Sequence, residues 1–295
     1  MRSAFAAEWR KLLGHTKAIA FLVWVYPIGA LMIVLLIQIL PALLLDPVRE
    51  MIAASPIDWT ENLLSVWNAM NGFPGGTFLR MPFIAFIAMA FAGEYQWGTW
   101  KNIVPRQSRM NLIFAKFLVL ALLLMLALLL TSLVLLAGGW LESVLFNVPY
   151  GPSLAELDWG AFLQQALLQV LVTFVSTLIV ASYAALIAMY SRSIIASLLL
   201  SVGVGIVELT SSVLLVIVSQ AVQRPNLVNI LVALPTYNLD NVRSWVVDGV
   251  GSTFGGYPGF TAVPPLWLSM VILLLWLGGL VGGTAVLFRH QDITS

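Results

Sequence analysis

MNLIFAKFLVLALLLMLALLLTSLVLLAGGW, residues 110–140, contains a single charged residue, Lys116. Its leucines show no period-two alternation, which favours a helix over a strand of a membrane barrel. A bilayer core admits only helices and closed barrels, because backbone groups must find partners within the protein there. A helix needs roughly 20 apolar residues to cross about 30 Å of hydrocarbon. This stretch is long enough, so it predicts a membrane-spanning helix.

The composition of the whole chain indicates a membrane protein. Charged residues make up 9 % of the 295 residues and the mean hydropathy is +0.97, whereas about a quarter of a soluble domain is charged. The sequence has no cysteine, hence no disulfide and no thiolate metal site or nucleophile. We therefore expect an all-α integral membrane protein, multi-pass in the cell (cytoplasmic) membrane, with one transmembrane domain over residues 1–295.

Six apolar runs predict six membrane-spanning helices. The second is the weakest, because only residues 81–93 are uncharged and Arg80 would have to snorkel to the far interface. Pro27 and Pro82 are expected to kink their helices. The first run is too long for a signal-peptide core, so we expect it to stay attached. The predicted spans are residues 18–45, 77–93, 110–140, 161–191, 193–222 and 264–288.

The distribution of Lys and Arg predicts the orientation. With a cytoplasmic N-terminus, ten of them fall inside and four outside, while nine acidic residues fall outside and three inside. Both termini are therefore predicted to be cytoplasmic. In the long outer segment 223–263, Asn226 to Leu234 predicts a short re-entrant or interfacial helix stopped by Pro235, followed by glycine-rich turns.

Residues 1–17 predict an amphipathic interfacial helix. Its apolar residues follow the i, i+4, i+7, i+8 spacing, with most charged residues elsewhere, as in a helix that lies in the interface plane. Two interpretations are open: a plain anchor before the first span, or an elbow helix that transmits movement to the bundle. The apolar face is Phe5, Trp9, Leu12, Leu13 and Thr16.

The segment between the second and third spans, residues 94–109, concentrates charge and tryptophan. Trp97, Trp100 and Val104 fall on one helical stripe, and Pro105 then breaks the helix and favours the start of the next one. We expect a short cytoplasmic amphipathic helix followed by a turn. This is the kind of stiff element through which a bundle receives force from a soluble partner.

Charged residues around this segment are expected to pair. Arg109 and Lys116 lie seven residues apart, hence nearly on one helical face, and Glu94 is the one acidic residue near enough to them. A competing interpretation is that topology alone places positive charge and tryptophan beside spans. It does not account for Gly98 and Thr99 or for the proline turn.

These positions resemble the second cytoplasmic segment of the type-2 (efflux) family of ABC transporter permeases. That family shows an acid, Gly-Thr, a basic residue, a Pro-x-Ser-Arg turn and a Lys in the next helix. The six-span layout, the amphipathic N-terminus and the long last outer segment extend the resemblance over nearly the whole chain. The matching residues are Glu94, Gly98, Thr99, Lys101, Pro105, Ser108, Arg109 and Lys116.

The resemblance implies a coupling helix that docks on separate ATP-binding subunits. It also implies a second permease copy, or a related permease, within the lipid bilayer. None of the chain's lysines follows a glycine, so a P-loop is absent, and ATP and Mg are expected on the partner. The implied coupling residues are Glu94, Trp97, Gly98, Thr99, Trp100, Lys101, Pro105 and Arg109.

Polar residues within predicted spans are candidates for the pathway or for helix packing. Glu208 is the only carboxylate well inside a span, where an ionised group costs about 2.5–3.5 kcal/mol on insertion scales. It is a substrate contact, a proton site or a packing hydrogen bond, and nearby glycines and serines favour packing. Gln38 and Gln169 are candidates for an outward-facing vestibule or plain interface residues.

Two functions remain after this sequence reading. The first is the permease subunit of an ATP-driven exporter whose cargo is hydrophobic or amphipathic, such as a drug, a peptide antibiotic or a lipid. The second is a stand-alone ion-coupled transporter or channel that uses Glu208. An enzyme is not expected, because no nucleophile, metal cluster or acid pair is visible, and no nucleic-acid partner is expected.

Overall fold

A computed structural model describes residues 2–14, 16–71, 75–103, 108–253 and 259–291. Helices dominate it, and the expected all-α class is confirmed. Among the described residues, four helices are long and apolar enough to cross a membrane, or five if the bent helix α11 is counted as one span. The helix at the second predicted span, α7 (Met81–Gln96), has only 16 residues. Six spans therefore stay a prediction.

The long helices begin at polar caps. Ser108 accepts the backbone N–H of Asn111 at the start of α9 (Arg109–Phe146), and Asp158 accepts two backbone N–H groups at the start of α10 (Trp159–Ser191). Ser193 caps α11 (Ile194–Ala221) in the same way. Capped ends of this kind satisfy donors that the helix leaves free. Helix α13 (Leu266–His290) differs, because it follows Pro265 and has no side-chain cap.

The first predicted span is a continuous helical path with an internal change of pitch. It consists of α2 (Thr16–Ile33), the π-helical turn η1 (Val34–Ile39) and α3 (Leu40–Leu44). Pro41 has no N–H to donate to the preceding turn, and the π-helical turn lies directly before it. Together these elements pack along α9.

Residues 46–71, between the first two predicted spans, are largely helical, although no helix was predicted there. They contain α4 (Asp46–Ala53), strand β1 (Ile57–Asp58) and α5 (Trp59–Asn71), and α6 (Gly75–Leu79) follows. Helix α5 packs between α9 and α10, with Trp67 buried and its Nε1–H donating to Ser132 Oγ at 2.9 Å. Strand β1 pairs in parallel with β2 (Tyr150–Gly151).

Arg80 lies at the break between α6 and α7 and does not snorkel to an interface. It donates to the carbonyl of Met70 at 2.8 Å and to the hydroxyl of Ser176. The carbonyls at the end of α5 lack helical partners, so a buried guanidinium finds acceptors there. Pro82 stands in the first turn of α7 instead of kinking a longer helix.

The last outer segment also differs from expectation. A 3₁₀ helix, η3 (Pro225–Ala233), covers the short helix that was predicted. Pro235 does not stop it before a run of turns, because α12 (Pro235–Val247) begins at that residue. Proline is favoured at a first helical position, where its missing N–H has no partner to lose.

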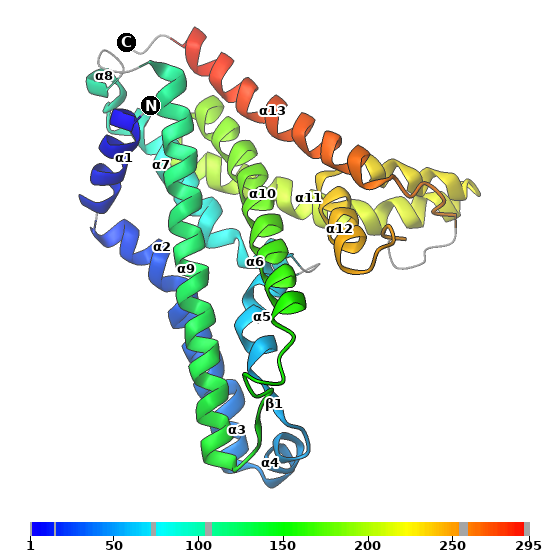
Figure 1. The fold of residues 1–295 in the computed structure, drawn as a ribbon. Coiled ribbons are helices and arrows are strands. Elements are labelled where there is room, and N and C mark those ends of the chain that lie inside the picture. The colour runs from blue at the N-terminus through cyan, green and yellow to red at the C-terminus, as the bar shows by residue number, and fades with distance from the viewer. Residues whose placement is uncertain (1, 15, 72–74, 104–107, 254–258, 292–295) are drawn as a thin grey trace.

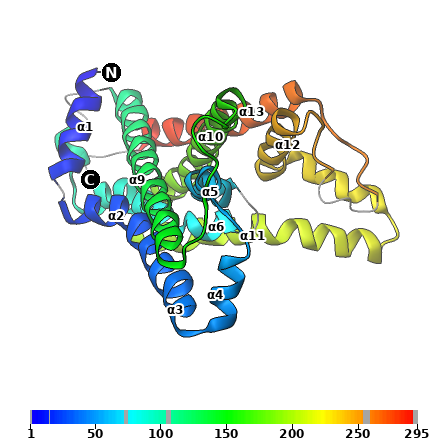
Figure 2. The same cartoon turned by 60° about the horizontal axis from the view of Figure 1, so that its bottom comes forward.

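The helices divide into a central group and a lateral group (Figure 1). Helices α9 and α10 run close together with α5 and α7 beside them, while α11 and α12 extend to one side and α13 runs from that side back to α9 and α10 (Figures 1 and 2). Helix α1 and the end of α13 lie at the same end of the molecule (Figure 1). Large apolar side chains are exposed on the outer helices, including Trp24, Leu199 and Leu274, as a lipid environment permits.

Candidate functional site

Helix α7 ends in a glycine turn within residues 94–109, which we call the coupling segment after the role predicted for it. The N–H of Thr99 donates to the carbonyl of Glu94 at 3.0 Å, and the N–H of Gly98 donates to that of Tyr95 at 3.1 Å. This pair of bonds is a Schellman motif, which needs a left-handed residue at its centre. Gly98 has a φ of +63° and supplies it without a steric penalty. The Gly-Thr pair in the sequence therefore has a local structural cause.

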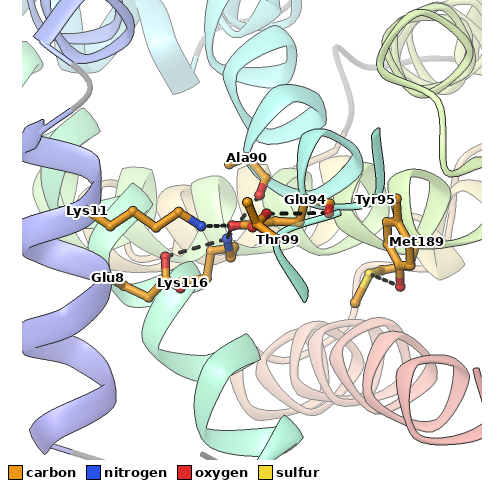
Figure 3. A network of polar contacts seen from close by, with 8 residues as sticks. All are labelled: Glu8, Lys11, Ala90, Glu94, Tyr95, Thr99, Lys116 and Met189. Atoms are coloured by element: carbon orange, nitrogen blue, oxygen red, sulfur yellow. Dashed lines mark hydrogen bonds and ion pairs between the residues drawn. The ribbon is translucent and has the colours of Figure 1, made fainter. Parts of the chain in front are cut away.

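Glu94 sits at the centre of a buried charged cluster, defined here as Glu8, Lys11, Glu94 and Lys116 (Figure 3). Its carboxylate accepts from Lys116 Nζ at 2.6 Å, from Lys11 Nζ and from the hydroxyl of Thr99. Only 3 % of Glu94 is exposed. The predicted pairing of Glu94 with Lys116 is thus present, and this carboxylate faces the interior of the protein.

Lys116 completes the cluster from helix α9. Its Nζ also donates to the carbonyl of Ala90 at 3.0 Å and lies 3.5 Å from Glu8 Oε2. The ammonium lies 5.2 Å from the centre of the Trp100 ring, within the range of a cation–π contact. Two carboxylates and two ammonium groups balance one another, which is the condition under which buried charges are tolerated. The cluster therefore joins α1, α7 and α9.

Glu94, which follows the predicted span 77–93, is ionised in this setting. Burial by itself raises the pKa of a carboxyl group, but the positive charges of Lys116 and Lys11 outweigh burial and lower the pKa of Glu94 to about 2. Both lysines also donate hydrogen bonds to the charged form. Glu94 consequently keeps its negative charge throughout the physiological range of pH.

A second set of contacts ties the coupling segment to the C-terminal helix. Trp100, in the short helix α8 (Trp100–Ile103), is buried and its ring centre lies 4.5 Å from that of Phe288 on α13. Arg109 does not join the charged cluster; it donates to the carbonyls of Phe288, Arg289 and Gln291 at the end of α13. A cation at these free carbonyls stabilises a helix C-terminus.

Gln291, which directly follows α13, connects the end of that helix to α7 and α10. Its Nε2 donates to the carbonyl of Met189 at 2.8 Å, and its Oε1 accepts from the hydroxyl of Tyr95. Adjacent residues of α7 thus reach different neighbours: Glu94 reaches α1 and α9, and Tyr95 reaches Met189 on α10 (Figure 3). Tyr95 also reaches Gln291, the C-cap of α13. The end of α7 is anchored to four helices.

The coupling segment has an exposed face as well as a buried one. Trp97 is 60 % exposed, and Gly98 and Lys101 are exposed beside it. The Trp97 ring packs against Gly93, where an added Cβ would lie 2.7 Å from the ring. This contact fixes the position of the tryptophan ring. Pro105 lies outside the described residues. Exposed Trp97, Gly98 and Lys101 form what we call the tip, and Glu94, Thr99 and Trp100 anchor it.

The N-terminal helix α1 (Arg2–Gly14) packs on α9. Phe5 and Trp9 stack with ring centres 5.9 Å apart and pack, partly buried, against the hydrophobic core. The side chains of Leu12 and Leu13 lie outside the part that the structure describes. Sequence reasoning missed the role of Glu8 and Lys11, because it treated the polar face of this helix as solvated.

Comparison with known proteins identifies the family. A family model described as ABC-2 family transporter protein matches residues 6–202, more than half of the chain. The chain belongs to the ABC-2 transporter family. The match runs from α1 through α7, the coupling segment, α9 and α10 into α11, so it contains the whole charged cluster. A search of curated proteins and a search of solved structures each found no match.

Gln169 and Gln38, the glutamine candidates for the ABC-2 pathway, have different surroundings. Gln169 is 1 % exposed; its Nε2 donates to Asn68 Oδ1 at 2.6 Å, and its Oε1 accepts from Asn71 Nδ2 at 3.1 Å. These bonds join α5 to α10, so Gln169 packs helices together. Gln38 is exposed in η1. The partners Asn68 and Asn71 were missed because their segment was taken as an outer loop.

Glu208 lies beyond the stretch that matches the ABC-2 family. It is half-buried on α11 and accepts a hydrogen bond from the hydroxyl of Thr236 on α12. It lines a small cavity together with Arg80 and Tyr183. In the described residues no group of three or more His, Asp or Glu side chains is arranged to hold a metal ion.

Proposed function

We propose that this ABC-2 family chain is the permease subunit of an ATP-driven exporter in the cell membrane. In the proposal, residues 94–109 dock on a separate ATP-binding subunit, which carries ATP and Mg. The observation that carries the proposal is the division of the coupling segment into an exposed tip and a buried anchor. The tip offers an exposed tryptophan ring, a residue type enriched in protein interfaces, and a lysine whose charge can complement an acidic surface on a partner.

The anchor gives the tip a mechanical role. A force applied to Trp97 and Lys101 acts on the end of α7 and the turn that follows it. That region is bound to α1 and α9 through Glu94 and to α13 through Trp100. Packed helices respond to such a force by moving as bodies, because close-packed interiors resist gradual deformation. Nucleotide-driven closure of the docked subunits would then tilt these helices together. This supports a direct transfer of force from the partner to the bundle.

The pathway itself is proposed to form with a second copy of this chain or a related permease. Exposed apolar side chains over α2, α11 and α13 provide surface for lipid and for such a neighbour. The proposed cargo is hydrophobic or amphipathic, such as a drug, a peptide antibiotic or a lipid. The strongly apolar bundle is what supports this class of cargo.

The test is a purification of the tagged protein from its native host in mild detergent, with identification of every co-purifying chain and a vanadate-sensitive ATPase assay. We expect a stoichiometric ATP-binding subunit, and its loss in the double variant Trp97→Ala, Lys101→Ala. The matched control is Trp267→Ala, Arg224→Ala, which removes an exposed tryptophan and an exposed cation elsewhere. Equal retention of the subunit by both variants would refute docking at the tip.

The competing proposal is a stand-alone ion-coupled transporter or channel that uses Glu208. It predicts a protein that purifies without an ATPase subunit. In reconstituted vesicles, Glu208→Gln would then change the pH dependence of ion-driven flux. A Glu208→Gln variant with unchanged pH dependence, together with a co-purifying ATPase, would leave only the first proposal.

A further inference from the structure

Arg80 and Glu208 line one small cavity inside the helical bundle, where three interruptions of helices meet. Arg80 stands at the break between α6 and α7, and Glu208 at a bend of 41° within α11. Thr236, in the first turn of α12, lines the same cavity. Opposite charges and interrupted helices therefore converge at one place in the bundle.

The two charges face each other without direct contact. Arg80 uses one terminal nitrogen for the carbonyl of Met70 and the hydroxyl of Ser176, but its Nε is buried and has no hydrogen-bond partner. Glu208 attracts Arg80 electrostatically, yet none of the ion pairs within 4.0 Å among the described residues joins them. A buried donor without a partner and a carboxylate that forms no ion pair with it thus belong to two residues that line one cavity.

The space has the size and polarity of a water site. Its volume is about 30 Å³. A polar cavity holds a water molecule when it offers roughly 10–15 Å³ and two to four polar partners. Besides Arg80 and Glu208, the hydroxyl-bearing residues Ser176, Tyr183 and Thr236 line it. Charged groups within a bundle are stable only when paired or hydrated, so an empty cavity between these two would be unfavourable.

We propose that one or two water molecules occupy this cavity and bridge Arg80 Nε to the carboxylate of Glu208. The hydrated pair then locks α12 and the bend of α11 onto α7 and α10. Glu208 holds α12 through Thr236, and Arg80 holds α5 and α10 through Met70 and Ser176. The lock stands on these contacts alone and does not depend on the proposed ATPase partner.

The first experiment asks whether the cavity is hydrated. Val180 lines the cavity, and Val180→Ile adds one methyl group to it in the full-length protein in lipid nanodiscs. Displacing well-ordered water lowers stability, so we expect the midpoint of thermal unfolding to fall by about 3 °C or more. The matched control is Val218→Ile on the exposed face of α11, with no expected change. A midpoint that rises or stays the same marks a dry cavity and overturns the proposal.

The second experiment asks whether the charges act as a pair. Arg80→Met and Glu208→Met each leave one charge unmatched and should lower the unfolding midpoint by about 5 °C or more, whereas the double variant should recover much of the loss. Amide hydrogen exchange over residues 235–247 should accelerate severalfold in each single variant and in Thr236→Val. Losses that simply add in the double variant, or exchange that is unchanged in all three, contradict the lock.

Discussion

The charged cluster at the end of α7 and the cavity between Arg80 and Glu208 solve the same problem in different ways. In the cluster, Lys116 and Glu94 are in direct contact at 2.6 Å, and both are almost fully buried. In the cavity, Arg80 and Glu208 stand apart at interrupted helices. Direct pairing joins helices through the charged side chains themselves, whereas the separated pair depends on the proposed water to complete its lock. The first joint is therefore expected to respond to loss of a charge, and the second also to filling of the cavity.

The largest expected effect comes from breaking the first joint. Lys116→Met leaves Glu94 and Glu8 buried near one another with less positive charge between them, and should reduce the free energy of unfolding by about 3–5 kcal/mol. Chemical denaturation in nanodiscs measures it. Lys101→Met is the control, because that lysine is exposed and its loss should change stability by less than about 0.5 kcal/mol. Equal stability of the two variants would contradict the pairing.

The next effect is a dependence on pH that is specific to Glu94. Its pKa is lowered from 4.5 to about 2 in the folded protein, so the unfolded chain binds a proton first as the pH falls. The stabilisation is fully present above about pH 5 and is lost as the pH falls from there toward 2, a change of about 3 kcal/mol. Unfolding midpoints between pH 6 and 3 report it.

The matched variant for this titration is Glu94→Gln. It should be less stable than the wild type at pH 6, and its stability should vary less between pH 6 and 3. A variant that loses stability with acid as steeply as the wild type would assign the titration to another carboxyl group.

A smaller effect tests the turn that presents the tip. In Gly98→Ala, a Cβ meets nothing within 4 Å, so only the positive φ opposes it. The expected loss is about 1 kcal/mol. Gly203→Ala is the control; it also has open space but lies within α11 without a positive φ, so its stability should be equal or greater. If both variants behave alike, the Schellman turn is not what requires Gly98.

The substitution expected to change stability least, at Lys101, should clearly weaken docking of the ATP-binding subunit. Lys101→Ala should leave the unfolding free energy within about 0.5 kcal/mol of the wild type. Under the proposed function it should weaken binding of the ATP-binding subunit about tenfold, equivalent to roughly 1.4 kcal/mol. Titration of the purified subunit onto nanodiscs checks this. Wild-type affinity in Lys101→Ala would move the docking surface away from the tip.

Sequence reasoning located the long helices well. Helices α9, α10 and α11 begin within two residues of the predicted spans, because an apolar run and a Ser or Asp cap determine each start locally. The contact between Glu94 and Lys116 was also predictable, since Glu94 lies near the end of α7 and Lys116 lies in the first turns of α9, the next long helix. Signals of this kind are contained within a few neighbouring residues.

What sequence reasoning missed depends on neighbours distant along the chain. Glu8 and Lys11 lie on the polar face of α1, and only the approach of α7 and α9 makes that face an interior one. Helix α5 was missed because its polar residues bond to α9 and α10, partners that a local sequence pattern does not reveal. Pro235 was read as a stop, although a proline starts a helix as readily as it ends one.

The charged cluster has an electrical consequence. Glu8 and Glu94 carry two negative charges, and Lys11 and Lys116 carry two positive ones, so the group is neutral as a whole. Moving one elementary charge across a membrane potential of 100 mV involves about 2.3 kcal/mol. A neutral group that shifts as a body does almost no work against that field. The cluster itself would therefore add almost nothing to any voltage dependence of the movement proposed for α7 and α9.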